Sequence, residues 1–230
     1  MAYPNSLPLL PKPIKAVFLD FDGVLLDSEI LYQRFWKEAF KEFGYEAPKE
    51  ILLKLRSCDA AIGEKIMSSF FQEPFPYEKV RARRKELMSA YLRTHEIPLK
   101  KGALSFLKYL KNNAILAYIV SSSPKSTISY ELKKRHIDSY IDDVLSAKEV
   151  KKGKPYPDVY LKALETSRLK RSEVLVFEDS PNGIESAYRA GLNVVMVDDL
   201  DSADLETSKK IILEVTDLSN IQKRDLFSRT

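Results

Sequence analysis

The chain has 230 residues, of which 44% are hydrophobic and 30% are charged, and its formal net charge is +4. This composition is typical of a soluble globular protein with one large domain, or with a domain that carries a modest insertion. The mild charge comes without a recognition motif, so no nucleic-acid partner is expected. No apolar run approaches the roughly 20 residues that span a bilayer, so no membrane partner is expected either.

Cysteine and histidine are scarce. The single cysteine, Cys58, excludes an internal disulfide and fits a reducing compartment, which predicts a cytoplasmic protein. The two histidines, His95 and His136, argue against a zinc site built from several His or Cys ligands. Residues 1–13 are rich in proline and lack a long apolar stretch, so they predict an extended arm rather than a signal peptide.

The first predicted strand covers residues 14–19, and a helical block follows it. Apolar residues recur at spacings of three and four from residue 31 to about 43. Further helices are predicted over 49–55, 60–71 and 77–93. We therefore predict an inserted all-helical domain over residues 31–96.

From residue 97 onward, short apolar runs alternate with helical patterns. Strands are predicted over 115–120, 143–146, 174–177, 194–197 and 211–213. Helices are predicted over 103–111, 127–134, 157–166 and 184–190. This alternation is typical of an α/β fold, a Rossmann-like parallel sheet with helices on both faces. The core domain is expected to consist of residues 14–30 and 97–230.

Polar residues follow the predicted strands, at the point where each strand ends. Asp20 and Asp22 come after the first strand, Ser121 after the second, and Glu178 and Asp179 after the strand over 174–177. In open α/β sheets, ligands bind outside the carboxyl ends of the strands. Side chains that are far apart in sequence are therefore expected to meet in one crevice.

The residue types in this crevice indicate phosphoryl chemistry. Clustered carboxylates without histidine or cysteine favour a hard cation, and Mg²⁺ is the best candidate. One carboxylate can attack a phosphoryl group, and a second can donate and accept the proton. A hydroxyl such as Ser121 and a lysine would bind the phosphoryl oxygens. The best lysine is Lys154, in the loop-like stretch over 151–158 that contains two prolines, although a loop lysine taken singly is usually solvated. Glu178 and Asp179 taken singly are also explained as acids before a helix.

Together, these segments resemble the four signatures of the haloacid dehalogenase (HAD) superfamily. Residues 20–24, Asp-Phe-Asp-Gly-Val, resemble its nucleophile signature, and Ser121 resembles the second signature. Lys154, in Gly-Lys-Pro-Tyr-Pro-Asp, resembles the third, and residues 178–184 resemble the acidic metal signature. The helical insertion is similar to the small cap of this family. With Asp-Ser-Glu at 27–29, it places the chain near the β-phosphoglucomutase-like group of phosphatases and mutases.

The resemblance implies roles for the acids. Asp20 would be the nucleophile and a Mg²⁺ ligand. Asp22 would be the general acid and base, with its backbone carbonyl on the metal. Asp179 would be a metal ligand, and Glu178 would contact the metal directly or through water.

The resemblance also implies a phosphate-binding set and contacts from the cap. Ser121, Ser122 and Lys154 would bind the phosphoryl group. The mutases of this group have a histidine where this chain has Tyr32, and a neutral phenol is a poor proton acceptor near pH 7. In an ungapped alignment, Asp59 falls at the mutase arginine, where an acid would repel a second phosphate. Arg56 would then be the cationic contact of the substrate, with a surface arginine as the alternative.

The resulting hypothesis is a Mg²⁺-dependent phosphatase that hydrolyses a small phosphorylated metabolite, such as a sugar phosphate, through an aspartyl phosphate. A β-phosphoglucomutase-type mutase is the first alternative, and a catalytically weak binding or regulatory module is the second. A monomer or weak dimer is expected. The basic cluster over residues 79–85 is predicted to be the solvated face of a helix, with attraction of an anionic substrate as the alternative.

Overall fold

The core is a six-stranded, fully parallel sheet with the strand order β3-β2-β1-β4-β5-β6. The computed structural model describes residues 13–71, 75–200 and 202–223, so the predicted N-terminal arm lies outside the described residues except for its last one. The strands are β1 (Ala16–Leu19), β2 (Leu116–Ser121), β3 (Asp143–Ser146), β4 (Val174–Glu178), β5 (Asn193–Val197) and β6 (Leu213–Val215). The predicted α/β class with a parallel, Rossmann-like sheet is confirmed.

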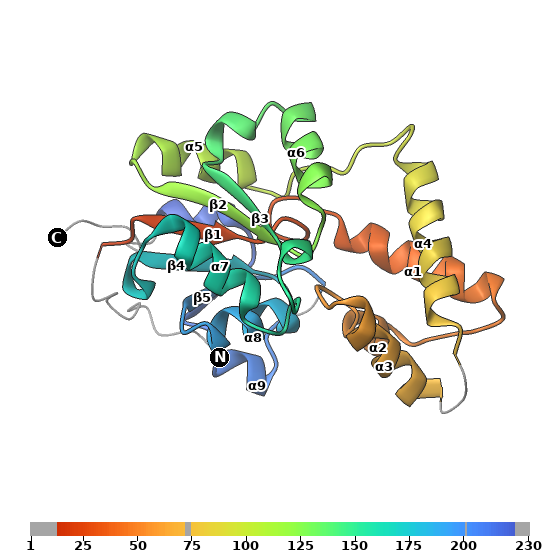
Figure 1. Ribbon diagram of the computed structural model, residues 1–230. Coiled ribbons are helices and arrows are strands. Elements are labelled where there is room, and N and C mark those ends of the chain that lie inside the picture. The colour runs from red at the N-terminus through yellow and green to blue at the C-terminus, as the bar shows by residue number, and fades with distance from the viewer. Residues whose placement is uncertain (1–12, 72–74, 201, 224–230) are drawn as a thin grey trace.

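Helices cover both faces of this sheet (Figure 1). The helices α5 (Ala103–Asn112) and α6 (Lys125–Lys134) lie on one face, and α7 (Asp158–Ser167) and α8 (Pro181–Arg189) lie on the other. The short helix α9 (Leu205–Ser208) follows β5. Short 3₁₀ turns complete the core: η1 (Asp138–Tyr140), η2 (Ala147–Glu149), η3 (Arg171–Glu173) and η4 (Leu218–Lys223).

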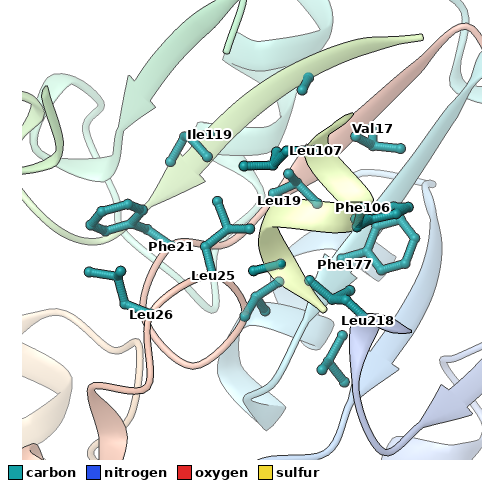
Figure 2. Packing of buried hydrophobic residues seen from close by; sticks show 14 of the residues in the cluster. Val17, Leu19, Phe21, Leu25, Leu26, Phe106, Leu107, Ile119, Phe177 and Leu218 are labelled. Carbon is teal, nitrogen blue, oxygen red and sulfur yellow. The ribbon is translucent and has the colours of Figure 1, made fainter. Parts of the chain in front are cut away.

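The central strand β1 contributes side chains to both hydrophobic layers, because its side chains alternate between the two faces of the sheet. Val17 and Leu19 point into the layer beneath α5, where they lie near Phe106 and Phe177 (Figure 2). Ala16 and Phe18 point into the layer beneath α7 and α8. All four residues of β1 are fully buried. The strand is therefore fixed from both sides, and the acids that follow it start from a rigid position.

Helices α1–α4 form a separate group beside the sheet (Figure 1). They are α1 (Glu29–Glu42), α2 (Lys49–Leu53), α3 (Ala60–Phe71) and α4 (Tyr77–Tyr91). Helices α1 and α4 pack together, and an aromatic cluster of Trp36, Phe40, Phe75 and Tyr77 fills the space toward α2 and α3. This group has its own apolar core, as the predicted helical insertion requires.

The two connections between the helical group and the sheet run side by side. Leu26 and Leu99 form an antiparallel bridge, and the Asp27 N–H donates to the Pro98 carbonyl at 2.9 Å. These contacts lie near the predicted domain boundaries at 30 and 97. The division into a core and a cap stays a prediction.

The predicted and observed elements differ at a few ends. The predicted last strand over 211–213 was misplaced, because β6 begins at Leu213 and ends at Val215. Helix α8 begins at Pro181, three residues before the predicted start, because the Ser180 hydroxyl caps it by accepting from the Gly183 N–H at 3.1 Å. Helix α9 was not predicted, since four residues are too short for a periodic signal.

The close approach of α5 to η4 predicts how strongly two glycine substitutions lower the free energy of unfolding. Gly102 has φ +85°, and a Cβ there would lie 2.2 Å from the Ser219 backbone nitrogen. Gly44 has φ +78° with nothing within 4 Å of such a Cβ. Gly44→Ala is expected to cost only the left-handed conformation, about 1–2 kcal/mol. Gly102→Ala is expected to cost at least about 2 kcal/mol more, because backbone must move. Urea denaturation of the two variants measures the difference, and equal losses would contradict this packing.

Candidate active site

Three acids meet at the carboxyl ends of the neighbouring strands β1 and β4. Asp20 directly follows β1, Glu178 ends β4, and Asp179 comes next. One carboxylate oxygen from each of the three lies within 4.8 Å of the others, and none of these residues is more than 1% exposed. The predicted convergence of these acids is therefore present in the structure.

Lys154 joins two of these acids in the interior. Its ammonium lies 3.1 Å from Asp20 Oδ1 and donates to Glu178 Oε1 at 2.5 Å and to the Val120 carbonyl at 3.0 Å. The side chain is fully buried, so it is not the solvated loop lysine of the alternative interpretation. Burial lowers the pKa of Lys154, but the Asp20 and Glu178 carboxylates outweigh burial and raise it. Lys154 therefore stays charged.

Opposing effects act on the pKa of the Asp20 carboxyl. Burial raises the pKa of its carboxyl to about 7, although Lys154 opposes the shift. Glu178 and Asp22 add to the rise because they are like charges. A cation placed beside Asp20 would return this group to its ionised form.

Glu178 already has a full set of hydrogen bonds. Its Oε1 accepts from Lys154 and from the Tyr160 hydroxyl at 2.7 Å, and its Oε2 accepts from the Asp179 N–H at 3.3 Å. Gly183 leaves room for this carboxylate, since a Cβ there would lie 2.1 Å from it. Glu178 is thus held by the protein on both oxygens, which suits a group that positions Lys154.

Asp179 is different, because both of its carboxylate oxygens are buried without a hydrogen-bond partner among the residues that the structure describes. Burial raises the pKa of this carboxyl well above its usual range, although the Arg56 guanidinium opposes the shift. Gly23, at φ +84°, makes room for the group: a Cβ there would lie 2.3 Å from Asp179 Oδ2. Oxygen ligands without protein partners, gathered in a buried cluster, fit a hard divalent cation such as Mg²⁺. Asp20 and Asp179 could hold it.

Asp22 lies at the rim of this cluster rather than within it. Its Oδ1 accepts from the Ser28 hydroxyl and its Oδ2 from the Ser123 hydroxyl, each at 2.7 Å. The carboxylate is thereby fixed and faces the cavity described below. Neither serine was singled out from the sequence. The run of three serines at 121–123 was visible, but only the fold shows which of them reaches Asp22.

The serines after β2 have separate contacts. Ser121 is buried, lines the cavity and accepts from the Ser123 N–H at 3.1 Å. Ser122 also lines the cavity, but its hydroxyl donates to the Ser57 carbonyl at 3.0 Å. Ser122 therefore connects the core to the segment between α2 and α3, a contact that the phosphate-binding prediction did not include.

That segment sits directly on the acidic cluster. Arg56 Nη2 donates to the Asp179 carbonyl at 2.6 Å, and Asn182 Nδ2 donates to the Arg56 carbonyl at 2.7 Å. Arg56 is only 4% exposed, so it is not a surface arginine. Its charge acts on Asp179 and on the buried Glu29, whose pKa burial raises to about 8.

A cavity of about 220 Å³ lies between the helical group and the sheet edge. Tyr32 lines it, and the Asp22 carboxylate and burial raise the pKa of the Tyr32 hydroxyl, so near pH 7 even less phenolate is present to accept a proton than for an ordinary tyrosine. Asp59 does not line this cavity; its Oδ1 accepts from the Ile62 N–H at 3.0 Å at the start of α3. The expected repulsion of a second phosphate by Asp59 is therefore not supported by its position.

A parallel sheet with buried acids at its carboxyl edge, beneath a helical insertion, defines a class of hydrolytic α/β enzymes. The chain belongs to the haloacid dehalogenase-like hydrolase family, whose model matches residues 17–197. The predicted superfamily is confirmed, and the match spans both the sheet and the helical insertion.

Named relatives cover nearly the whole chain. The phosphorylated carbohydrates phosphatase of Thermotoga maritima is 26% identical over 93% of this chain and 100% of its own length. The (DL)-glycerol-3-phosphatase 2 of Arabidopsis thaliana is 30% identical over 89% of this chain and 88% of its own. The solved β-phosphoglucomutase of Clostridium difficile shares the fold, with a TM-score of 0.74, 22% identity and coverage of 91% and 96% of the two chains. None of the helices in the described ranges has the length and apolar content needed to cross a membrane.

If the Asp179 carboxylate holds a metal ion, its replacement should remove the stabilisation of the protein by Mg²⁺. In EDTA at pH 8, Asp179→Asn is expected to melt at the same temperature as the wild type or higher, because it removes a buried charge whose raised pKa opposes folding above pH 4. Mg²⁺ at about 100 times its Kd should stabilise the wild type by about 2.7 kcal/mol. The variant should lose this gain.

Thermal denaturation with and without Mg²⁺ measures both effects. Asp27→Asn is the matched control, since Asp27 is partly exposed and its nearest cation is Lys100 at 3.7 Å. An equal response of Asp179→Asn and the control to Mg²⁺ would mean that Asp179 does not hold the ion.

Proposed function

We propose that this protein is a Mg²⁺-dependent phosphatase of small phosphorylated metabolites that works through an aspartyl phosphate on Asp20. The observation that carries the proposal is the buried arrangement of Asp20, Asp179 and Lys154, of which Asp20 lines the cavity between the helical group and the sheet edge. The named phosphatase relatives, whose names specify phosphorylated carbohydrates and glycerol 3-phosphate, support the substrate class.

In this proposal the phosphoryl group enters the floor of the cavity. Lys154 and Ser121 bind its oxygens, and the serine hydroxyl lies in the same wall as Asp20. When bound by Asp20 and Asp179, Mg²⁺ supplies positive charge that offsets the repulsion between the carboxylates and the phosphate. The backbone carbonyl of Asp22 remains a proposed further ligand, and Glu178 acts on the site through Lys154.

Two displacements complete the proposed reaction. The Asp20 carboxylate attacks phosphorus, the bond from phosphorus to the leaving oxygen breaks, and Asp22 gives that oxygen its proton. Asp22 then takes a proton from water as the water attacks phosphorus, and the bond to Asp20 breaks to release phosphate. Ser28 and Ser123 hold the Asp22 carboxylate in one orientation through both steps.

The cavity and its cover support water exclusion during the reaction. The segment over 54–57 is tied to the core by hydrogen bonds from Ser122, Asn182 and Arg56. In this proposal the cover closes over the bound substrate by movement at the paired connections near Leu26 and Leu99. Arg56 is proposed to hold the cover closed, in place of the substrate contact expected from the sequence.

The proposal predicts the effect of removing the nucleophile. Asp20→Asn should lower kcat by at least about a thousand-fold, because the amide cannot form the phosphorylated intermediate. A panel of phosphorylated metabolites assayed for phosphate release, with and without Mg²⁺, measures this. Asp27→Asn, in the same loop, should retain activity. Wild-type turnover by Asp20→Asn, with contaminating phosphatase excluded, would overturn the covalent mechanism.

A mutase differs from a phosphatase in the fate of the phosphoenzyme. Tyr32 argues against a mutase, because its pKa is raised where the mutases have a histidine. Supplying β-glucose 1-phosphate with a trace of the bisphosphate should yield phosphate faster than isomerised sugar. Isomerisation much faster than phosphate release would replace the phosphatase with the mutase. Measurable Mg²⁺ binding with no turnover on any ester would favour a binding or regulatory module.

A further inference from the structure

A buried arginine projects into the cavity from the helical group. Arg84 lies on α4, lines the cavity and is only 8% exposed. Its guanidinium carbon lies 4.9 Å from the centre of the Tyr32 ring and 5.3 Å from that of Trp36. Its Nη1 lies 3.7 Å from Met88 Sδ. These aromatic and sulfur neighbours hold the group without neutralising it.

Arg84 has no carboxylate partner among the described residues. No ion pair joins it to an acid in that part of the chain, and its buried Nε has no hydrogen-bond partner. Its neighbour Arg83 is the opposite case: it is exposed and pairs with Glu42 at 2.5 Å and Glu86 at 3.1 Å. A buried cation without an anion costs free energy, which a bound anion would recover.

Other cations surround the same space. Arg81, Lys85 and Lys148 also line the cavity, while its acids, Asp20, Asp22 and Glu29, lie toward the sheet edge and the start of α1. Burial lowers the pKa of Lys85, and Arg81 and Arg84 lower it further by repulsion. The acids thus lie at the floor of the cavity, near the sheet edge, where Arg56 is also found, and the wall formed by α4 carries Arg81, Arg84 and Lys85, with Lys148 contributed by η2.

The basic cluster over 79–85 therefore divides between two faces of one helix. Arg83 belongs to the solvated face that the sequence predicted, and Arg84 and Lys85 belong to the alternative, a surface that attracts an anionic substrate. The floor of the cavity, by the proposed function, takes the phosphoryl group. The wall of α4 then faces whatever the phosphoryl group is attached to.

We propose that the preferred substrates are small phosphoesters whose leaving group carries a second anionic group, and that Arg84 binds this group. The inference rests on the proposed function for the orientation of the ester. A carboxylate and a second phosphate share the required chemistry, since the planar guanidinium pairs with either through two hydrogen bonds.

Non-hydrolysable probes test the binding site without turnover. The first set is a series of phosphonocarboxylates of increasing chain length, each matched to an alkylphosphonate of the same length. The second set is a series of α,ω-bisphosphonates from propane upward. Isothermal titration in Mg²⁺ measures the Kd of each. The wild type is expected to bind the doubly anionic member of at least one length about ten- to hundred-fold more tightly than its match. The set that shows this preference identifies the second group.

Three variants test which side chain gives this preference. Arg84→Met keeps the length of the side chain and removes its charge, so it should abolish the preference while leaving alkylphosphonate binding unchanged. Arg83→Met removes a charge one residue away on the solvated face and should keep the preference in full. Arg84→Lys keeps the charge but loses the planar fork, so it should retain only part of the preference.

The outcomes separate this inference from the proposed function. If no chain length shows a preference, or nothing binds, or the preference survives Arg84→Met, the role of Arg84 is wrong whatever the enzyme hydrolyses. The wild-type comparison decides this even where a variant does not fold. If the preference is present but no phosphoester is turned over, the binding site stands and the phosphatase proposal fails.

Discussion

The structure depends on an excess of negative charge buried at one sheet edge. Asp20, Glu178 and Asp179 contribute carboxylates there, and Lys154 contacts two of them, Asp20 and Glu178. Each buried ion costs several kcal/mol in desolvation, and only good pairing offsets this. Within the described part of the chain, the carboxylate of Asp179 has no hydrogen-bond partner, so a cation bound there would be stabilising. The glycines at 23 and 183 follow from the same constraint, because any side chain there would collide with these carboxylates.

The helical group lies over these buried acids and, in our proposal, keeps them from bulk water. Its segment over 54–57 is hydrogen-bonded to the core through Ser122, Asn182 and Arg56. The cavity that remains has acids where the sheet ends and the cations Arg81, Arg84 and Lys85 along α4, with Arg56 and Lys148 as further cations from other segments. An ester with a phosphoryl group at one end and an anion at the other matches this polarity along its whole length. In our proposal, the same helices thus both exclude water and select the substrate.

Much of this arrangement could be predicted from the sequence. The apolar run before Asp20 and Asp22 and the alternation after residue 97 predict the sheet, and the strand ends predict which acids meet. Local periodicity is strong in buried strands and amphipathic helices, so these elements were found almost at their observed bounds. The short helix α9 and the register of β6 depend on tertiary packing and gave no such signal.

The parts of the site that could not be predicted are contacts across the fold. Arg84 lies four residues from both Val80 and Met88, so the helical spacing places it on the buried face of α4 and Arg83 beside that face, a signal that the sequence interpretation did not use. By contrast, the contacts of Asp22 with Ser28 and Ser123 join residues that are 6 and 101 positions apart. Asp59 was misjudged for the same reason, because an alignment gives a position but not the direction of the side chain.

The most direct test is chemical detection of the phosphorylated acid. The enzyme is mixed with Mg²⁺ and a substrate from the panel, quenched in acid during turnover, and reduced with borohydride, which converts an aspartyl phosphate to homoserine. Peptide mass spectrometry then locates the change. Homoserine at position 20, present only when substrate and Mg²⁺ are both supplied, is the predicted result. Sustained turnover with Asp20 unmodified, or with the modification at another acid, would contradict the assignment of Asp20 as the nucleophile.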